Sequence, residues 1–172
     1  MNLIGRKLTK LELKELLESA LKEKNSGKKG KKFEYFFENF MAQQDGFVYV
    51  NKHCRSKVGE IDYLYRSEHL DHPLWKNYHY IFIECKNWGD KIGSRELNHF
   101  INLIQAKAFL NCFGVYLATG SLSQQAQTTI RDARIKDKLL IIPIERRDLY
   151  SLIEKGFKDH IQEACDKILS KA

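Results

Sequence analysis

Apolar residues recur at helical spacing near the start of the chain, in the segment 9–24. They lie three or four positions apart, at Leu13, Leu16, Leu17, Ala20 and Leu21. Thr9 and Glu12 precede this stripe with the spacing of a capping box, in which each side chain accepts a hydrogen bond from the backbone of the other residue. The pattern predicts an amphipathic helix at the periphery of the protein.

A stripe of large apolar residues predicts a second helix, which contains Phe33, Phe36, Phe37, Phe40 and Met41. Such a stripe is typical of a helix face that packs into the core. The segment 25–32 reads NSGKKGKK, and its glycines and lysines interrupt the helical pattern. We therefore expect a linker there, either a solvated hinge or an arm that contacts phosphates. The lysines of this candidate arm are Lys28, Lys29, Lys31 and Lys32.

The rest of the pattern alternates between strands and helices. Runs of β-branched and aromatic residues predict strands over 47–54, 58–66, 77–86, 114–120 and 139–144. Helical periodicity predicts helices over 94–111, 121–137, 148–155 and 158–170. Loop chemistry around Pro73 separates the second strand from the third. Pro143 places the last strand near an edge or an end of the sheet, because proline cannot donate to a central ladder.

This order of elements predicts an α/β fold with a mixed central β-sheet. Three consecutive strands favour an antiparallel meander, and the alternating helices and strands that follow favour crossover units. Helices are expected on both faces of the sheet, with an added N-terminal helix. We divide the chain into an N-terminal amphipathic helix (1–26), a core (27–145) and a C-terminal helical extension (146–172).

Length and composition fit one soluble globular domain. The chain has 172 residues, of which 43% are hydrophobic and 30% are charged, so enough apolar surface is available to offset the loss of chain entropy. Its four cysteines form no CxxC pair, which argues against a zinc site. No apolar run approaches the roughly 18 residues of a membrane span, and the N-terminus does not resemble a secretory signal. We expect a cytoplasmic protein with reduced thiols and no membrane association.

The net charge indicates a class of partner. Lys and Arg number 29 against 22 Asp and Glu, which gives a formal charge of +7. A basic excess of this kind favours polyanions, and nucleic acid is the first candidate.

Candidate chemistry lies where the third predicted strand ends, in the stretch IFIECK. Side chains alternate along a strand, so Glu84 and Lys86 share one face. By the same rule Glu60, Asp62 and Leu64 share a face of the preceding strand. If the two strands form a hairpin, Asp62 can lie beside Glu84. Two neighbouring carboxylates resist joint ionisation unless a cation lies between them, and Mg²⁺ is bound by such oxygen ligands together with several waters.

These residues and the elements around them resemble the PD-(D/E)XK nuclease superfamily, most closely the Mrr-like restriction endonucleases. The resemblance runs from about Gly27 to Leu152 and rests on the motifs GKKFEYFF, GEIDYLY, IFIECK and GVYLATGSLSQQA, in that order. Two features depart from the founding pattern. The gap between Asp62 and Glu84 is long, which calls for a longer hairpin loop, and Ile61 stands where that pattern has proline.

The resemblance implies a restriction-endonuclease-like fold and a site for Mg²⁺, with Mn²⁺ as a substitute. The motif acids would be Asp62 and Glu84, and Lys86 would hold or help to deprotonate the attacking water. Glu34, in the first core helix, would support the metal, and the backbone carbonyl of Cys85 would be a further ligand. The implied activity is metal-dependent hydrolysis of phosphodiester bonds in DNA by an endonuclease.

Other polar residues carry weaker signals. Glu60 could bind metal or could be an exposed charge, and Gln105 is a possible auxiliary group. Ser121 and Ser123 are better explained as helix caps than as nucleophiles. Five histidines show no spacing typical of metal ligands and are interpreted as surface or core residues, namely His53, His69, His72, His79 and His99.

Several alternatives stay open at the level of sequence. A Holliday-junction resolvase or a ribonuclease could use the same scaffold, because the site chemistry does not encode the shape of the substrate. A nucleic-acid-binding module without turnover is a second alternative, and an interaction protein with an incidental basic face is a third. A homodimer would allow paired cuts in two strands, but the sequence does not decide the oligomeric state.

Overall fold

The protein is represented by a computed structural model that describes residues 7–56, 59–69, 71–107 and 111–170. The helices of this part of the chain are α1 (Lys10–Lys22), α2 (Ser26–Met41), α3 (Ser94–Lys107), α4 (Gln124–Lys136), α5 (Leu149–Lys155) and α6 (Phe157–Leu169). Its strands are β1 (Phe47–Ser56), β2 (Gly59–Ser67), β3 (Tyr80–Lys86), β4 (Cys112–Ala118) and β5 (Ile141–Ile144). None of these helices has the length and apolarity that crossing a membrane requires.

The strands form one sheet in the order β1-β2-β3-β4-β5. β1, β2 and β3 pair as an antiparallel meander, and β4 and β5 add to it in parallel. The predicted mixed sheet is therefore confirmed. β5 lies at an edge, where Pro143 is tolerated.

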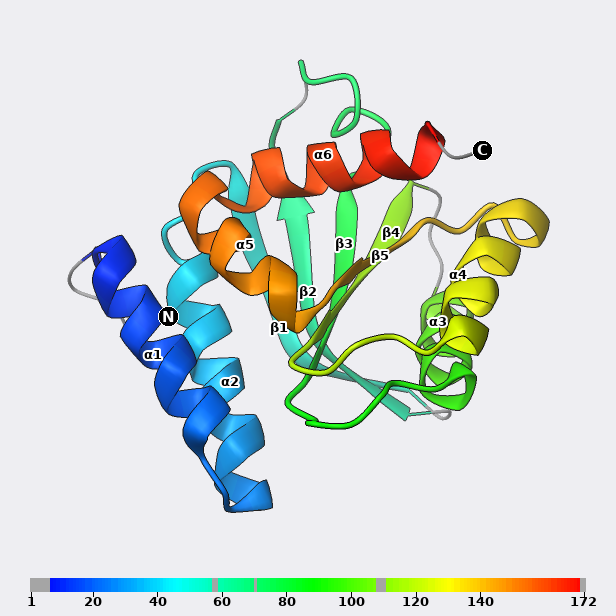
Figure 1. The fold of residues 1–172 in the computed structure, drawn as a ribbon. Helices are drawn as coiled ribbons and strands as arrows, with labels where there is room; N and C mark the ends of the chain where they lie inside the picture. Colours follow the sequence, from blue (N-terminus) through cyan, green and yellow to red (C-terminus); the bar gives the residue numbers. More distant parts are fainter. Residues whose placement is uncertain (1–6, 57–58, 70, 108–110, 171–172) are drawn as a thin grey trace.

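Helices cover both faces of this sheet (Figure 1). α1, α2, α5 and α6 share one hydrophobic core with the first face, and α3 and α4 share a second core with the other face. The residues of β3 alternate between the cores as expected, since Ile83 lies in the first core and Phe82 in the second. The division of the chain at residues 26 and 145 stays a prediction, although the terminal helices contribute to the first core.

The first helix begins as the sequence predicts, but the expected linker over 25–32 is wrong. Thr9 and Glu12 form the capping box of α1. α2 already begins at Ser26, because the Asn25 side chain caps it and accepts a hydrogen bond from the Lys28 N–H at 3.0 Å. Helix propensity is a weak prior, and the cap together with the buried aromatic stripe outweighs two glycines. The four lysines of the candidate arm therefore lie on a helix.

The ribbon of β1 and β2 bends before it reaches its tip. His53 has a φ of +53° within β1, in the left-handed region. On β2, Tyr63 lies in the first core but Ile61 lies in the second, so the regular alternation does not hold across Asp62. The expected common face of Glu60 and Asp62 is therefore interrupted. Past the bend, the Lys107 ammonium of α3 donates to the Arg55 carbonyl at 3.1 Å and holds the ribbon against that helix.

A long connection joins β2 to β3, as the gap between the two motif acids requires. Trp75 is fully buried in this connection. Its ring lies 5.1 Å from the ring of Phe47 and 5.6 Å from that of Phe113, measured between centroids. This anchor allows the connection to be long without loosening the hairpin that positions Asp62 and Glu84.

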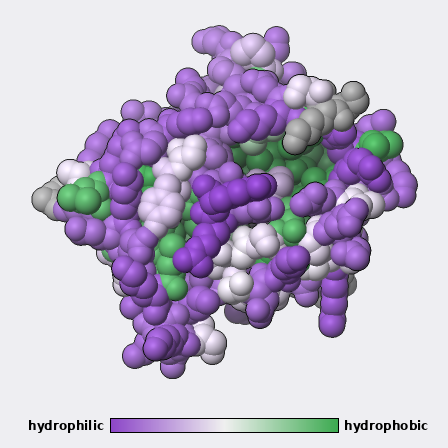
Figure 2. All heavy atoms as spheres, in the orientation of Figure 1, coloured by the Kyte–Doolittle hydropathy of each residue, from purple (hydrophilic) through white to green (hydrophobic). Residues whose placement is uncertain are grey.

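The surface over this frame is mostly hydrophilic, and apolar side chains form only small areas on the face drawn in Figure 2. This agrees with the amphipathic pattern of the helices that the sequence predicts.

Two glycines test the fold in opposite directions. A Cβ added to Gly30 meets nothing within 4 Å, so Gly30→Ala should stabilise α2 by about 0.5–1 kcal/mol through helix propensity. A Cβ added to Gly120 would lie 2.2 Å from the backbone oxygen of Asp90, so Gly120→Ala should destabilise the protein by about 1–3 kcal/mol. Urea unfolding measures both changes. No gain for Gly30→Ala would contradict a helical segment at 26–32.

Candidate active site

Asp62 lies where the ladder between β2 and β3 ends. The last pair of that ladder is Tyr63 with Ile83, and Asp62 and Glu84 are the next residues on the two strands. An Oδ2 atom of Asp62 accepts a hydrogen bond from the Cys85 N–H at 2.7 Å. A carboxylate thus takes the place of a backbone partner. Because the N–H and C=O groups of one strand residue point to the same side, the Cys85 carbonyl also points toward β2, beside Asp62.

Glu84 is a buried carboxylate on the face of the sheet that α3 covers. Its residue is 5% exposed, and its Oε1 atom forms an ion pair with the Lys86 ammonium. Its Oε2 atom is buried and has no hydrogen-bond partner within the described ranges. Burial raises the pKa of Glu84 to about 7, and the charge of Asp62 acts in the same direction against the attraction of Lys86.

The neighbouring groups respond to the same environment. Burial also raises the pKa of Asp62, although the Cys85 N–H and the Lys86 charge oppose this shift. Burial disfavours the charged form of Lys86, but the carboxylates of Glu84 and Asp62 outweigh burial and raise the pKa of Lys86. The two acids therefore resist joint ionisation, whereas the lysine stays protonated at neutral pH.

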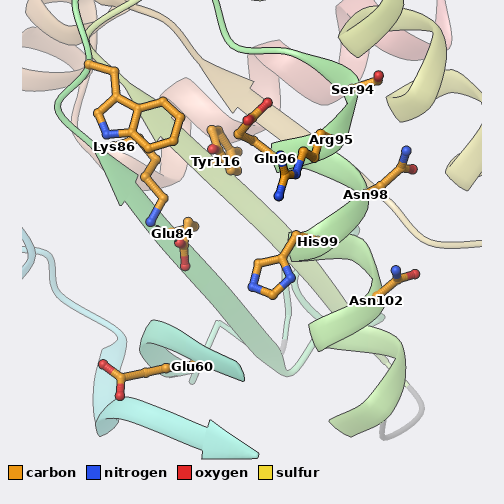
Figure 3. Close-up of a pocket in the computed structure, with 11 residues that line it drawn as sticks. Glu60, Glu84, Lys86, Ser94, Arg95, Glu96, Asn98, His99, Asn102 and Tyr116 are labelled. Carbon is orange, nitrogen blue, oxygen red and sulfur yellow. Dashed lines mark ion pairs between the residues drawn. The ribbon is translucent and has the colours of Figure 1, made fainter. Parts of the chain in front are cut away.

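Glu84 and Lys86 border a cavity of about 880 Å³ between the sheet and α3 (Figure 3). Residues from β2, β3 and β4 line it together with the first turns of α3; the strand residues are Glu60, Glu84, Lys86 and Tyr116. The exposed Trp88, in the loop after β3, also borders it. A ligand in the cavity could thus reach the Glu84 carboxylate from the side of α3, although most of β3 is buried.

Glu34 reaches this region from α2, the helix that covers the opposite face of the sheet. Its carboxylate pairs with the Lys52 ammonium at 3.1 Å, and Glu38 pairs with the same ammonium at 2.6 Å. The charge of Glu34 still contributes to the raised pKa of Asp62. Glu34 is therefore near Asp62, but its part in a metal site stays a prediction.

The remaining candidates that can be placed make contacts of their own within the protein. Glu60 is paired with Arg55 at 2.8 Å and with His53 at 2.6 Å. Ser123 caps α4, as expected. Lys32 pairs with Glu23 at 2.8 Å. The basic lysines of α2 thus stay a predicted, not an observed, contact surface for nucleic acid.

Two further groups near the site were not expected from the sequence. Asn87 is buried and donates to the carbonyls of Ala20 and Lys29, at 3.0 and 2.8 Å, while its own amide oxygen accepts from Thr119 at 2.8 Å. This network ties the end of β3 to α1, α2 and the end of β4. Its only signal in the sequence is the position of Asn87 directly after the motif lysine.

Tyr116 is the second unexpected group. It lies opposite Glu84 in the parallel register of β3 and β4 and is 1% exposed, and its hydroxyl has no hydrogen-bond partner in the described part of the chain. The strand register that brings it to Glu84 could not be derived from the sequence pattern.

Comparison with known families agrees with this geometry. The family described as restriction endonuclease, through its Mrr catalytic domain, matches residues 26–153. The chain belongs to this family. The match covers the sheet, the helices α2, α3 and α4, and every residue of the candidate site. This restriction endonuclease domain has the restriction-endonuclease-like nuclease fold that the motifs imply.

Three solved structures are similar to this restriction endonuclease domain at low identity. An EndoMS–dsDNA complex is 18% identical over 66% of this chain and 42% of that one, with a TM-score of 0.41. A repair endonuclease from Pyrococcus abyssi is 16% identical over 66% and 45%, also with a TM-score of 0.41. MspJI restriction endonuclease, in complex with a 27-mer oligonucleotide, is 13% identical over 96% and 38%, with a TM-score of 0.45. The chain spans less than half of each of these chains, and no curated protein matches it.

The donor set of the site fits a hard divalent cation. Within the described residues no three His, Cys, Asp or Glu side chains gather as a metal cluster. The site offers oxygen donors from the carboxylates of Asp62 and Glu84 and from the Cys85 carbonyl. The Oε2 atom of Glu84 has no partner in the described chain. Mg²⁺ prefers such oxygen ligands, with water completing its shell.

The raised pKa of Glu84 predicts a pH-dependent cost of folding. In the folded protein the carboxyl group of Glu84 has a pKa of about 7, whereas its usual pKa is 4.5. The stabilisation from the protonated form is therefore complete below about pH 4.5 and is lost as the pH rises to about 7. The glutamine of Glu84→Gln cannot ionise. The free energy of unfolding of this variant should therefore exceed that of the wild type by about 1–3 kcal/mol at pH 8 and should not exceed it at pH 4.5.

Urea unfolding across this pH range measures the difference. Glu154→Gln is the control, because Glu154 is an exposed carboxylate paired with Lys10 and Lys14, and it should show no gain at pH 8. A gain for Glu84→Gln that does not vary with pH would be evidence against the buried acid.

Proposed function

We propose that this chain is a Mg²⁺-dependent endonuclease that hydrolyses phosphodiester bonds in DNA. The observation that supports it most is the buried Oε2 atom of Glu84, which has no partner in the described chain and lies beside a second carboxylate, Asp62. A protein that buries two acids next to each other loses stability unless a cation binds there. The restriction endonuclease family supplies the class of reaction.

The residues divide the work according to their charge. Asp62, Glu84 and the Cys85 carbonyl would hold the divalent cation, which when bound stabilises charge on the phosphate and makes water more acidic. Lys86 stays protonated, so it would position the attacking water by donating a hydrogen bond instead of removing its proton. Glu34 would support the site through its influence on Asp62.

DNA is proposed as the substrate because of the family and the net charge of +7. The lysines of α2 are the proposed backbone contacts. Lys29 is suitably placed, since its ammonium lies near Gly89 in the loop that follows β3. Contacts of this kind are electrostatic, so binding should weaken as the salt concentration rises.

Cleavage of plasmid DNA tests the proposal. The wild type should cut with Mg²⁺ or Mn²⁺ and should not cut with chelator. Asp62→Asn, Glu84→Gln and Lys86→Met should each lower the rate by at least about 100-fold, because each removes a group that acts at the reacting phosphate. Branched DNA, single-stranded DNA and RNA in parallel assays distinguish resolvase and ribonuclease activity.

The matched control is Asp132→Asn on α4. Asp132 and Lys136 also form a carboxylate–ammonium pair, at 2.9 Å, but this pair is exposed and neither residue lines the cavity. This variant should cut at the wild-type rate. A folded Glu84→Gln protein that cuts as fast as the wild type would overturn the proposed function.

A further inference from the structure

The wall of the cavity opposite Glu84 carries hydrogen-bond donors that have no partner among the described residues. On α3, Arg95 and His99 project toward the strands that carry Glu84 and Tyr116 (Figure 3). Neither side chain has a hydrogen bond or an ion pair with another described residue. Elsewhere in the described chain exposed charges are commonly paired, as on α1 and α4. The α3 wall therefore keeps its donors free beside the candidate active site.

Tyr116 completes this set from the floor of the cavity. Its hydroxyl is buried, borders the cavity and has no partner in the described part of the chain. Burial raises the pKa of Tyr116, and so do the charges of Glu84 and Glu96, so the hydroxyl keeps its proton. A buried donor without an acceptor is costly, and this cost is removed when a ligand brings an acceptor to it.

We propose that Tyr116, Arg95 and His99 form a binding site for the phosphate oxygens of the substrate strand at the cut. All three groups can donate, and the non-bridging oxygens of a phosphodiester only accept, so the two chemistries match. Glu84 and Lys86 of β3 lie on one side of the cavity, and Arg95 and His99 of α3 lie on the other (Figure 3). This geometry places the strand to be cut between β3 and α3.

The identity of the ligand rests on the proposed function, but the test does not depend on cleavage alone. Arg95 and Tyr116 give different signals because only one of them is charged. Removing a cation that contacts phosphate lowers the slope of log K against log salt by about one, whereas a neutral donor releases no counterion. Arg95→Ala should therefore reduce the salt dependence of DNA binding, and Tyr116→Phe should not.

Tyr116→Phe removes one oxygen atom and nothing else. Because this buried hydroxyl has no partner in the described chain, the variant should unfold at the temperature of the wild type or above it. DNA binding in chelator and cleavage with Mg²⁺ should each weaken by about 2- to 10-fold, the value of one hydrogen bond. His99→Phe should act in the same direction. A structural role for the hydroxyl would instead lower the unfolding temperature.

Matched controls are present on the same elements. Asn98 and Asn102 also belong to α3 and border the cavity, but Figure 3 shows their side chains on the other side of the helix. Asn98→Ala and Asn102→Ala should leave the salt slope unchanged. Tyr65→Phe alters a buried tyrosine in the opposite core and should leave DNA binding and cleavage unchanged.

The outcomes separate this inference from the nuclease proposal. If the wild type cuts DNA but Arg95→Ala keeps the full salt slope and Tyr116→Phe keeps wild-type affinity and rate, the phosphate site is overturned and the nuclease proposal stands. If the wild type binds DNA without cutting it, and these variants still lose slope and affinity as stated, the phosphate site stands and the nuclease proposal fails.

Discussion

The placement of Asp62 and Glu84 at the end of one strand pair is the constraint on which the site depends. The hydrogen bond from the Cys85 N–H to the Asp62 carboxylate replaces a ladder contact and fixes that carboxylate beside Glu84. Burial then makes ionisation of both acids unfavourable, and a single lysine, Lys86, offsets only part of this cost. Keeping such a pair costs stability, and a bound cation would offset that cost.

The surrounding scaffold holds this arrangement from several directions. Asn87 and Thr119 link the ends of β3 and β4 to the first two helices through hydrogen bonds that are largely buried. Lys107 fixes the bent ribbon of β1 and β2 to α3. None of these three residues lines the cavity. The residues that hold the scaffold together are therefore different from the residues that a ligand in the cavity could contact.

Family membership and the cavity explain different features of this chain. Membership of the restriction endonuclease family accounts for the sheet and its strand order. The donors of α3 and the hydroxyl of Tyr116, which have no partner among the described residues, are features of the cavity itself. The proposed class of reaction thus follows from the family, whereas the proposed contacts to a substrate strand follow from the cavity.

The sequence by itself determined the elements and the candidate acids, because strand and helix periodicities are local and the order of elements limits how strands pair. Glu84 and Lys86 share a face through that rule alone, and the hairpin brings Asp62 to them. The sequence did not determine that the segment 25–32 is helical, since the cap by Asn25 and the docking of the aromatic stripe decide it.

Only the tertiary structure decided how the site is completed. The approach of Tyr116 depends on the register between two parallel strands, the pairing of Glu34 with Lys52 depends on how α2 docks, and the separation of Ile61 from Tyr63 depends on a bend in the ribbon. Each is a relation between segments far apart in the chain, and no local periodicity encodes such a relation.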